Sequence, residues 1–327
     1  MQLPKIILYS VQENGKMKSI GSAQMFRIIL VVMVVMLVGV GTMPASQPAQ
    51  AQTNEIEVIP ETISAGAWHS CGVRSDSTLS CWGDNTWGQA TPPAGTFSQV
   101  SAGTYNTCGL KGDGTIACWG DNSWGQSTPP PGTFSQVSAD GVNSCGVKSD
   151  GSVACWGDNS YGQSTPAAGI FSQVSAGYIH TCGLKTDGTL ACWGGNIDGQ
   201  TTAPAGTFNE VSAGGNFNCG LKSDGTLVCW GENTDGQSTP PPGTFSQVSA
   251  GDYHACGVKS DGTVACWGKN PAGESTPPAG TFSQVSAGLS HSCGINSSGA
   301  FVCWGSNTYG QSNPYPNSLF MPLVRKH

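Results

Sequence analysis

Fourteen cysteines are the residues whose type and spacing could carry chemistry, and they form seven pairs. The two members of a pair are ten residues apart, and successive pairs are displaced by 37 residues. The pairs are Cys71–Cys81, Cys108–Cys118, Cys145–Cys155, Cys182–Cys192, Cys219–Cys229, Cys256–Cys266 and Cys293–Cys303. A zinc site needs clustered ligands such as Cys-x-x-Cys, which this spacing does not provide. An even number of regularly paired cysteines favours disulfides in an oxidising compartment. We therefore predict seven disulfides, no metal site and no cofactor.

The first 51 residues indicate export to such a compartment. A basic segment, residues 16–27, precedes a short apolar run, residues 28–40, and small residues lead to a cleavage site after Ala51. This order is typical of a secretory signal peptide, in which Met17 would make a more ordinary start. The apolar run is shorter than the ~20 residues that a spanning helix needs, so we expect no transmembrane anchor after cleavage. The predicted location is secreted or on the cell surface.

The charge of the remaining chain excludes one class of partner. Residues 52–327 contain 9 Lys and Arg against 19 Asp and Glu, a net charge of −10. Proteins that bind nucleic acid neutralise phosphates with clustered basic side chains, and this chain has no basic stripe. We expect no nucleic-acid partner.

One 37-residue unit, residues 171–207, is enough to predict the local structure. Residues 171–176, 180–185 and 189–194 alternate in the manner of strands. The intervening Thr-Asp-Gly, residues 186–188, fits a three-residue hairpin loop with glycine in the left-handed region. About half of the repeat remains for connections, which leaves three short strands and no helix.

The register of this hairpin explains the cysteine spacing. The loop pairs Lys185 with Thr189, which places Cys182 opposite Cys192, and opposed strand residues are close enough for a disulfide. Leu184 then shares the cysteine face, whereas Trp193 lies on the other face. Both faces are apolar, so neighbouring repeats must cover both sides of the hairpin.

Short sheets that are buried on both faces and repeated at a fixed period suit a closed propeller or an open solenoid. An open stack needs polar end caps, and the first and seventh repeats are no more polar than the others. We predict an all-β, seven-bladed β-propeller with short three-stranded blades, each hairpin carrying a disulfide. It spans residues 52–318, with repeats at about 60–96, 97–133, 134–170, 171–207, 208–244, 245–281 and 282–318.

Two segments are candidates for the strand that closes the ring. Residues 57–65 occupy the first-strand position of the first repeat, and counting 37 residues from Phe282 reaches Leu319. The C-terminal tail, residues 319–327, is therefore either a closing strand or a tail for surface retention. We expect a monomer.

The motif in residues 176–200, AGYIHTCGLKTDGTLACWGGNIDGQ, resembles the regulator-of-chromosome-condensation repeat. The similarity lies in the Gly-x-x-His opening, the turn glycine and the final Trp-Gly-x-Asn-x-x-Gly-Gln, and it extends over all seven repeats. The resemblance implies a seven-bladed propeller. Members of that family include exchange factors for a nuclear GTPase and a secreted bacterial inhibitor of β-lactamase. Export and acidity argue against the exchange role and favour the secreted, bacterial type of binding role.

Residues that are the same in every repeat are poor candidates for a site, because a catalytic site needs an asymmetric arrangement. Four repeats carry a histidine at a position where other repeats carry asparagine, namely His69, His180, His254 and His291. This exchange predicts a structural hydrogen bond between blades. No nucleophile–base pair or phosphate loop is found. We therefore expect no catalytic residues and no enzymatic activity.

Residues that vary between repeats indicate a binding surface. They concentrate after Ser-Ala-Gly and inside Asn-x-x-Gly, in two loops that the strand order places on one face. In repeats seven, one, two and three these loops contain an aromatic arc: Trp68, Trp87, Tyr105, Trp124, Tyr161 and Tyr309. Repeats four to six offer instead Asp198, Glu232, Asp235, Asp252 and Glu274. Tyr and Trp are enriched at binding hot spots.

Three functions follow from this pattern. The first is a protein-binding module that uses the aromatic arc, with an unidentified extracellular protein as partner. The second is a carbohydrate-binding module on the same face, because aromatic rings also stack on sugars. The third is a propeller enzyme that acts at the central opening with a pair of acidic residues.

Overall fold

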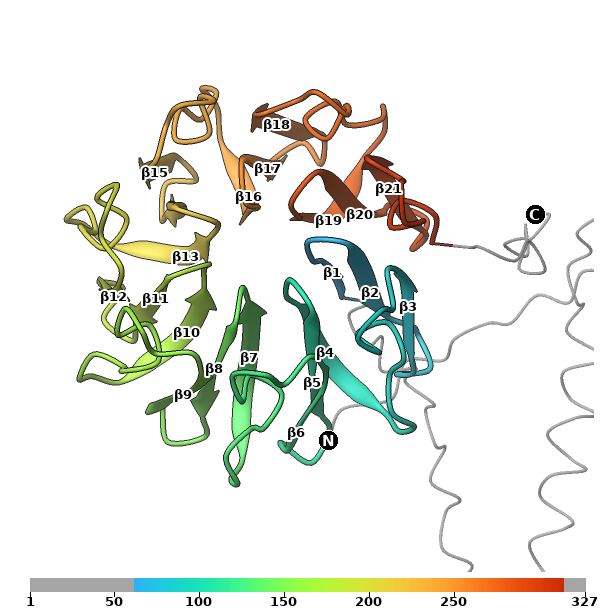
Figure 1. Cartoon of the computed structure of the whole chain (residues 1–327). Coiled ribbons are helices and arrows are strands. Elements are labelled where there is room, and N and C mark those ends of the chain that lie inside the picture. The colour runs from blue at the N-terminus through green and yellow to red at the C-terminus, as the bar shows by residue number, and fades with distance from the viewer. Residues whose placement is uncertain (1–61, 315–327) are drawn as a thin grey trace, which may run out of the picture. The chain divides into compact units, whose positions relative to one another are not determined.

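The computed structural model describes residues 62–314. Within that range the chain forms seven three-stranded antiparallel sheets and no helix, arranged as blades around a central channel (Figure 1). No helix of the described range could therefore cross a membrane. The predicted all-β, seven-bladed propeller is confirmed. The predicted signal peptide and C-terminal tail lie outside the described residues.

Each blade is built from one contiguous repeat. The inner strands are β1 (Ile63–Ala65), β4 (Phe97–Ala102), β7 (Phe134–Asp140), β10 (Phe171–Ala176), β13 (Phe208–Ala213), β16 (Phe245–Ala250) and β19 (Phe282–Ala287). The middle strands are β2 (His69–Val73), β5 (Asn106–Lys111), β8 (Asn143–Lys148), β11 (His180–Lys185), β14 (Phe217–Lys222), β17 (His254–Lys259) and β20 (His291–Asn296). The outer strands are β3 (Leu79–Gly83), β6 (Ile116–Gly120), β9 (Val153–Gly157), β12 (Leu190–Gly194), β15 (Leu227–Gly231), β18 (Val264–Gly268) and β21 (Phe301–Gly305).

The hairpin between the middle and outer strands has the predicted register. The amide of Lys185 donates to the carbonyl of Thr189 at 2.8 Å, and Gly188 has a φ of +83°. Cys182 consequently lies opposite Cys192, and the two form a disulfide. The other six pairs are bonded in the same way, which leaves no free cysteine. Closing so short a loop stabilises each hairpin by about 2–3 kcal/mol in the chain-entropy model.

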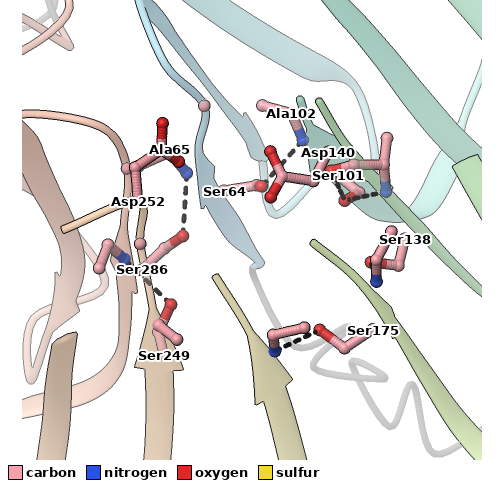
Figure 2. A pocket seen from close by; sticks show the side chains of 18 residues that line it. Ser64, Ala65, Ser101, Ala102, Ser138, Asp140, Ser175, Ser249, Asp252 and Ser286 are labelled. Carbon is pink, nitrogen blue, oxygen red and sulfur yellow. Dashed lines mark hydrogen bonds between the residues drawn. The ribbon is translucent and has the colours of Figure 1, made fainter. Parts of the chain in front are cut away.

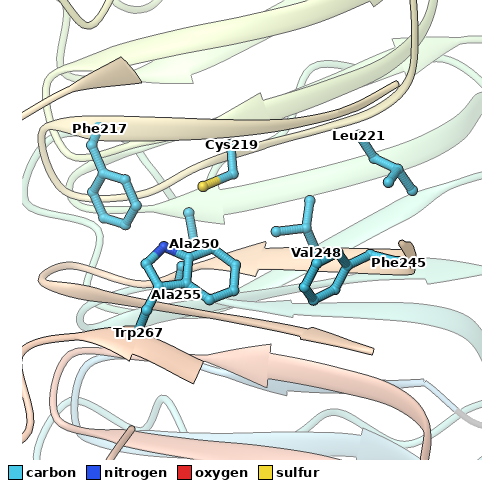
Figure 3. Packing of buried hydrophobic residues seen from close by; sticks show 8 residues of the cluster. All are labelled: Phe217, Cys219, Leu221, Phe245, Val248, Ala250, Ala255 and Trp267. Carbon is cyan, nitrogen blue, oxygen red and sulfur yellow. The ribbon is translucent and has the colours of Figure 1, made fainter. Parts of the chain in front are cut away.

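The hydrophobic core lies between the blades, as the two apolar faces of the hairpin predicted. Figure 3 shows one such layer, in which Cys219 and Leu221 of β14 face Val248 of β16 and Trp267 of β18. The cysteine face of one blade thus packs against the tryptophan face of the next. A single blade could not bury either face by itself.

Inner strands of neighbouring blades do not pair, so their backbone amides need other acceptors. The hydroxyl of Ser138 accepts a hydrogen bond from the amide of Ala176 at 3.0 Å, and the side chain of Gln136 accepts one from Val174 at 2.9 Å. The serine bond recurs at all seven junctions. The glutamine bond recurs at five junctions, and Glu210 makes the same kind of contact to Val248. These side chains protect the inner edges from pairing with other strands.

The indole N–H of each tryptophan in the outer strands also bonds to the preceding blade. Trp193 donates to the carbonyl of Gln163 at 2.9 Å, and Trp82 donates to the carbonyl of Gln311 at 2.8 Å across the closure between blades seven and one. The sequence suggested only a packing role for this ring. Phe171 covers Gly183, with ring carbons 2.6 Å from where a Cβ would stand, and Trp193 lies edge-on to that ring.

The closure uses the N-terminal segment. Ile63–Ala65 pairs with β2, and blade one has no phenylalanine within the described part of its inner strand. Phe301 of β21 takes its place, because its ring lies over Gly72 and stacks on Trp82 at 5.8 Å. The other blades carry an aliphatic residue at the position of Phe301. A single substitution in blade seven thus fills the gap left by blade one.

The histidines make the predicted hydrogen bonds between blades. His69 Nε2 lies 2.7 Å from Thr107 Oγ1, whose own hydrogen goes to the carbonyl of Gln89, so the ring donates from Nε2. Asn106 makes the equivalent bond to Ser144 at 3.2 Å. The Nδ1 atoms of all four histidines are buried without a partner. Burial lowers the pKa to about 4 for His69 and His180 and to about 3 for His254 and His291.

We predict that Phe301→Ala lowers the free energy of unfolding by about 3 kcal/mol, because it opens a cavity over Gly72 at the ring closure. Leu190→Ala is the matched control at the same strand position in blade four, where Phe208 already covers the glycine of the next blade. Its cost should be less than half as large in denaturant titrations. Equal costs would show that Phe301 has no special role in closure.

The histidines also predict acid destabilisation. The unfolded chain binds protons near pH 6.5, whereas the folded histidines bind them only near pH 3–4. The free energy of unfolding therefore does not vary with pH through these histidines above about pH 6.5. Between about pH 6.5 and the folded pKa it decreases as the pH falls, by about 1.4 kcal/mol per pH unit for each histidine. His254→Asn, which keeps a donor for Ser292, should reduce the slope of stability against pH by that amount. An unchanged slope would contradict the assignment.

Candidate functional site

The two variable loops of each blade lie on the same end of the propeller, as the strand order predicted. The loop between β1 and β2 and the loop after β3 are joined directly, since the amide of Asp84 donates to the carbonyl of Trp68 at 2.9 Å. The Asp-Gly turns between middle and outer strands occupy the opposite end. We call these ends the loop face and the hairpin face.

The structure exposes most of the aromatic arc on the loop face. Trp87, Trp124, Tyr161 and Tyr309 occupy the same position of the Asn-x-x-Gly loop in blades one, two, three and seven, and each is more than half exposed. Tyr105 is 37% exposed, whereas Trp68 is half-buried. The first four rings are exposed at equivalent positions of four adjacent blades, because blade seven adjoins blade one, and exposed apolar groups gathered on one face are typical of interaction sites.

Ring contacts connect parts of the arc across blade boundaries. Trp68 of blade one lies edge-on to Tyr309 of blade seven, with centroids 5.4 Å apart. Trp87 of blade one lies 6.5 Å from Tyr105 of blade two. Trp124 and Tyr161 make no ring–ring contact within residues 62–314 and project singly. The first pair spans the closure of the ring, so the arc forms only in the closed propeller.

The loops that present these rings are held by an internal network. Asp84 accepts hydrogen bonds from the amide and hydroxyl of Thr86 and, through its other oxygen, from Gln89 Nε2 at 2.8 Å. The Oε1 atom of Gln89 in turn accepts a hydrogen bond from the amide of Trp87 at 2.8 Å. The same network recurs around Asp121 and Asp158 in blades two and three. Blade seven keeps a weaker version, in which Gln311 bonds to Ser306.

Blades four to six lack this aspartate. Gly195, Glu232 and Lys269 stand at its position, and the Nε2 atoms of Gln200 and Gln237 are buried without a partner. The complete network is therefore found in three of the four loops that carry an exposed ring, those of blades one, two and three. In blades one to three the aspartate adds to the bonds that hold the backbone of the ring-bearing loop, and a fixed loop loses less entropy on binding.

Glu274 requires a correction. The sequence grouped it with the acidic residues of the variable loops, but it occupies the glutamine position of blade six and is fully buried. Its Oε2 accepts the amide of Ala272 at 2.8 Å, as the glutamines do in other blades. Asp198 and Asp235 are exposed on the loop face as expected.

The central channel opens on the loop face into a pocket of about 110 Å³ (Figure 2). Serine and alanine side chains of the inner strands line it, and two carboxylates, Asp140 and Asp252, lie at its mouth. Asp140 replaces the glycine of Ser-Ala-Gly in blade three, and its Oδ1 accepts the amide of Gly141 at 2.7 Å. Asp140 was not among the residues predicted from the sequence, although it departs from the repeat at that position.

The channel environment disfavours ionised carboxylates. Burial, and then the charge of Asp252, raise the pKa of Asp140 well above its usual range. Burial raises the pKa of Asp252 to about 6 and that of Glu210, deeper in the channel, to about 7. The serine hydroxyls beside them accept inter-blade hydrogen bonds and so serve the scaffold.

These features define a disulfide-stapled seven-bladed propeller with an aromatic loop face. The model of the Regulator of chromosome condensation (RCC1) repeat matches residues 61–89, 97–126, 134–163, 171–200, 208–237, 245–274 and 282–311. The chain therefore belongs to the RCC1-repeat family.

Among solved structures, the chain is similar to two plant receptor kinase ectodomains. It is 26% identical to that of CR4 from Physcomitrella patens, with a TM-score of 0.66 over 75% of this chain and 74% of that chain. It is also 26% identical to the CRINKLY WD40 ectodomain of ACR4 from Arabidopsis thaliana, with a TM-score of 0.66 over 74% of this chain and 94% of that chain. No curated protein sequence matches the chain.

Prp20p from Saccharomyces cerevisiae shares the fold, at 18% identity and a TM-score of 0.58 over 64% of this chain and 72% of that chain.

We predict that Asp121→Gly, which copies the residue of blade four, frees the loop of blade two. The amide of Ser123 loses its acceptor, so its hydrogen exchange should accelerate by about tenfold while global stability falls by about 1 kcal/mol or less. Exchange measured by NMR tests this, with the hairpin-turn variant Asp113→Asn as control. Unchanged exchange at Ser123 would mean that the network does not fix the loop.

Proposed function

We propose that the protein is an extracellular, non-enzymatic binding module that captures a protein partner through the aromatic arc. The observation that carries the proposal is the set of four exposed rings, Trp87, Trp124, Tyr161 and Tyr309, at one position of four adjacent blades. Tyr and Trp supply large contact areas with few rotatable bonds, which suits them to binding hot spots.

The construction of the loops supports this function. Three of the four rings sit on loops closed by the aspartate–glutamine network, so the surface is formed before a partner arrives. Binding to such a surface loses less conformational entropy than binding to a mobile loop. The rest of each blade is occupied by inter-blade contacts, which make the scaffold rigid and leave the loops free to vary.

The disulfides and the structural relatives support an extracellular location. All fourteen cysteines are paired, a state that persists in oxidising compartments. The two plant structures that the chain resembles are receptor ectodomains. In a surface protein of this kind, a rigid propeller would display one face to its surroundings.

The test is affinity capture with the disulfide-bonded protein as bait and mass spectrometry of the retained material. The variant with serine at positions 87, 124, 161 and 309 should lose the retained partner, with affinity falling by more than about 100-fold because hot-spot rings contribute over 2 kcal/mol each. A control variant replaces Ile170 with serine, because this residue is equally exposed but lies beside Gly151 in a turn of the hairpin face.

The control variant should capture the partner as the parent does. Retention by the arc variant, or equal loss in both variants, would place the binding surface elsewhere. Retention of polysaccharide in the absence of any protein would overturn the protein-partner assignment.

A further inference from the structure

The charges of the described chain are divided unequally between the two faces. The hairpin face is balanced, because a basic residue and an aspartate two positions later alternate in six of the seven turns. The basic residues are Arg74, Lys111, Lys148, Lys185, Lys222 and Lys259, and the aspartates are Asp76, Asp113, Asp150, Asp187, Asp224 and Asp261. Each aspartate accepts hydrogen bonds from the residue two positions further on, which lower its pKa, and the nearby cation lowers it further.

The loop face is strongly acidic. It carries eight carboxylates, namely Asp84, Asp121, Asp140, Asp158, Asp198, Glu232, Asp235 and Asp252, and a single cation among the described residues, Lys269. Lys269 is already engaged, since its Nζ lies 4.5 Å above the ring of Tyr253. The excess of negative charge on this face is thus not neutralised by the protein itself.

Neighbouring groups respond to this negative field. The pKa of Tyr253 is raised by burial and then by the charges of Asp252, Glu232 and Asp235. These carboxylates belong to blades five and six, and Asp252 lies at the channel mouth (Figure 2). The aromatic arc on blades seven, one, two and three lies on the same face. A partner that covers both halves therefore meets aromatic rings beside uncompensated carboxylates.

We propose that the partner of the loop face is a basic polypeptide, whose apolar side chains pack on the aromatic arc while its lysine and arginine side chains face the carboxylates of blades four to six. This inference rests on the proposed protein-binding function and adds the chemistry of the partner. Opposite charges across an interface steer association and exclude wrong partners, and an acidic polypeptide or polyanion would be repelled by this face.

The probe is a library of random peptides of about 12 residues displayed on phage and selected on the disulfide-bonded protein at about 0.05 M salt, where exposed charges interact over ~10 Å or more. Retained peptides should combine aromatic or aliphatic residues with lysine and arginine, at least about twofold enriched over the unselected library. Raising the salt to about 0.5 M should weaken the binding of a selected peptide by about tenfold, because screening removes the attraction.

Two variants with the same change in net charge separate the faces. Asp198→Asn, Glu232→Gln and Asp235→Asn together remove three charges from the loop face, and Asp113→Asn, Asp187→Asn and Asp224→Asn remove three from the hairpin face. The loop-face variant should bind the selected basic peptide about tenfold more weakly at low salt, whereas the hairpin-face variant should bind it as the parent does. Equal weakening in both variants would reduce the effect to net charge and overturn the proposal.

The outcomes distinguish this inference from the function on which it rests. Retained peptides that are lost with the arc variant but show no excess of lysine and arginine would leave the binding function standing and overturn the basic partner. Basic peptides that the arc variant still retains would overturn the role of the aromatic arc. Failure to retain any peptide would count against both.

Discussion

The whole fold depends on one constraint, which is that an isolated blade leaves apolar surface exposed and backbone amides without partners. Its two faces are apolar, and its inner strand has unpaired amides. The neighbouring blade supplies the missing contacts through the serine and glutamine side chains, the indole N–H of the tryptophan and the histidine ring. Each contact joins one repeat to the next, so stability requires a closed ring in which no blade is left without a neighbour.

The disulfide has a different role from these contacts. It lies within one hairpin and fixes the register of the two strands, so that leucine and cysteine share one face and tryptophan the other. The register then determines which surfaces meet between blades. Because local and inter-blade constraints agree at every repeat, the scaffold tolerates variation in the loops, where the aromatic and acidic residues are found.

Departures from the repeat are the informative positions in such a chain. Phe301 fills the gap at the ring closure, Asp140 and Glu210 place carboxylates in the channel, and the loops of blades four to six lack both the aspartate and the exposed ring that blades one to three carry. Residues that recur in all seven repeats make the contacts within and between blades. Residues that depart from the repeat give individual blades different side chains at the loop face and in the channel.

The amino-acid sequence by itself determined the repeat, the strands, the disulfide pairing and the end of the propeller that carries the variable loops, because these follow from spacing along the chain. It also predicted that the histidine slot bonds between blades. Only the tertiary structure decided that Glu274 is buried, that Trp68 lies edge-on to Tyr309, that Phe301 covers Gly72 of blade one, and that Asp140 and Asp252 share the channel mouth. Such contacts join residues from different blades, and their geometry is set by ring closure, which no local pattern encodes.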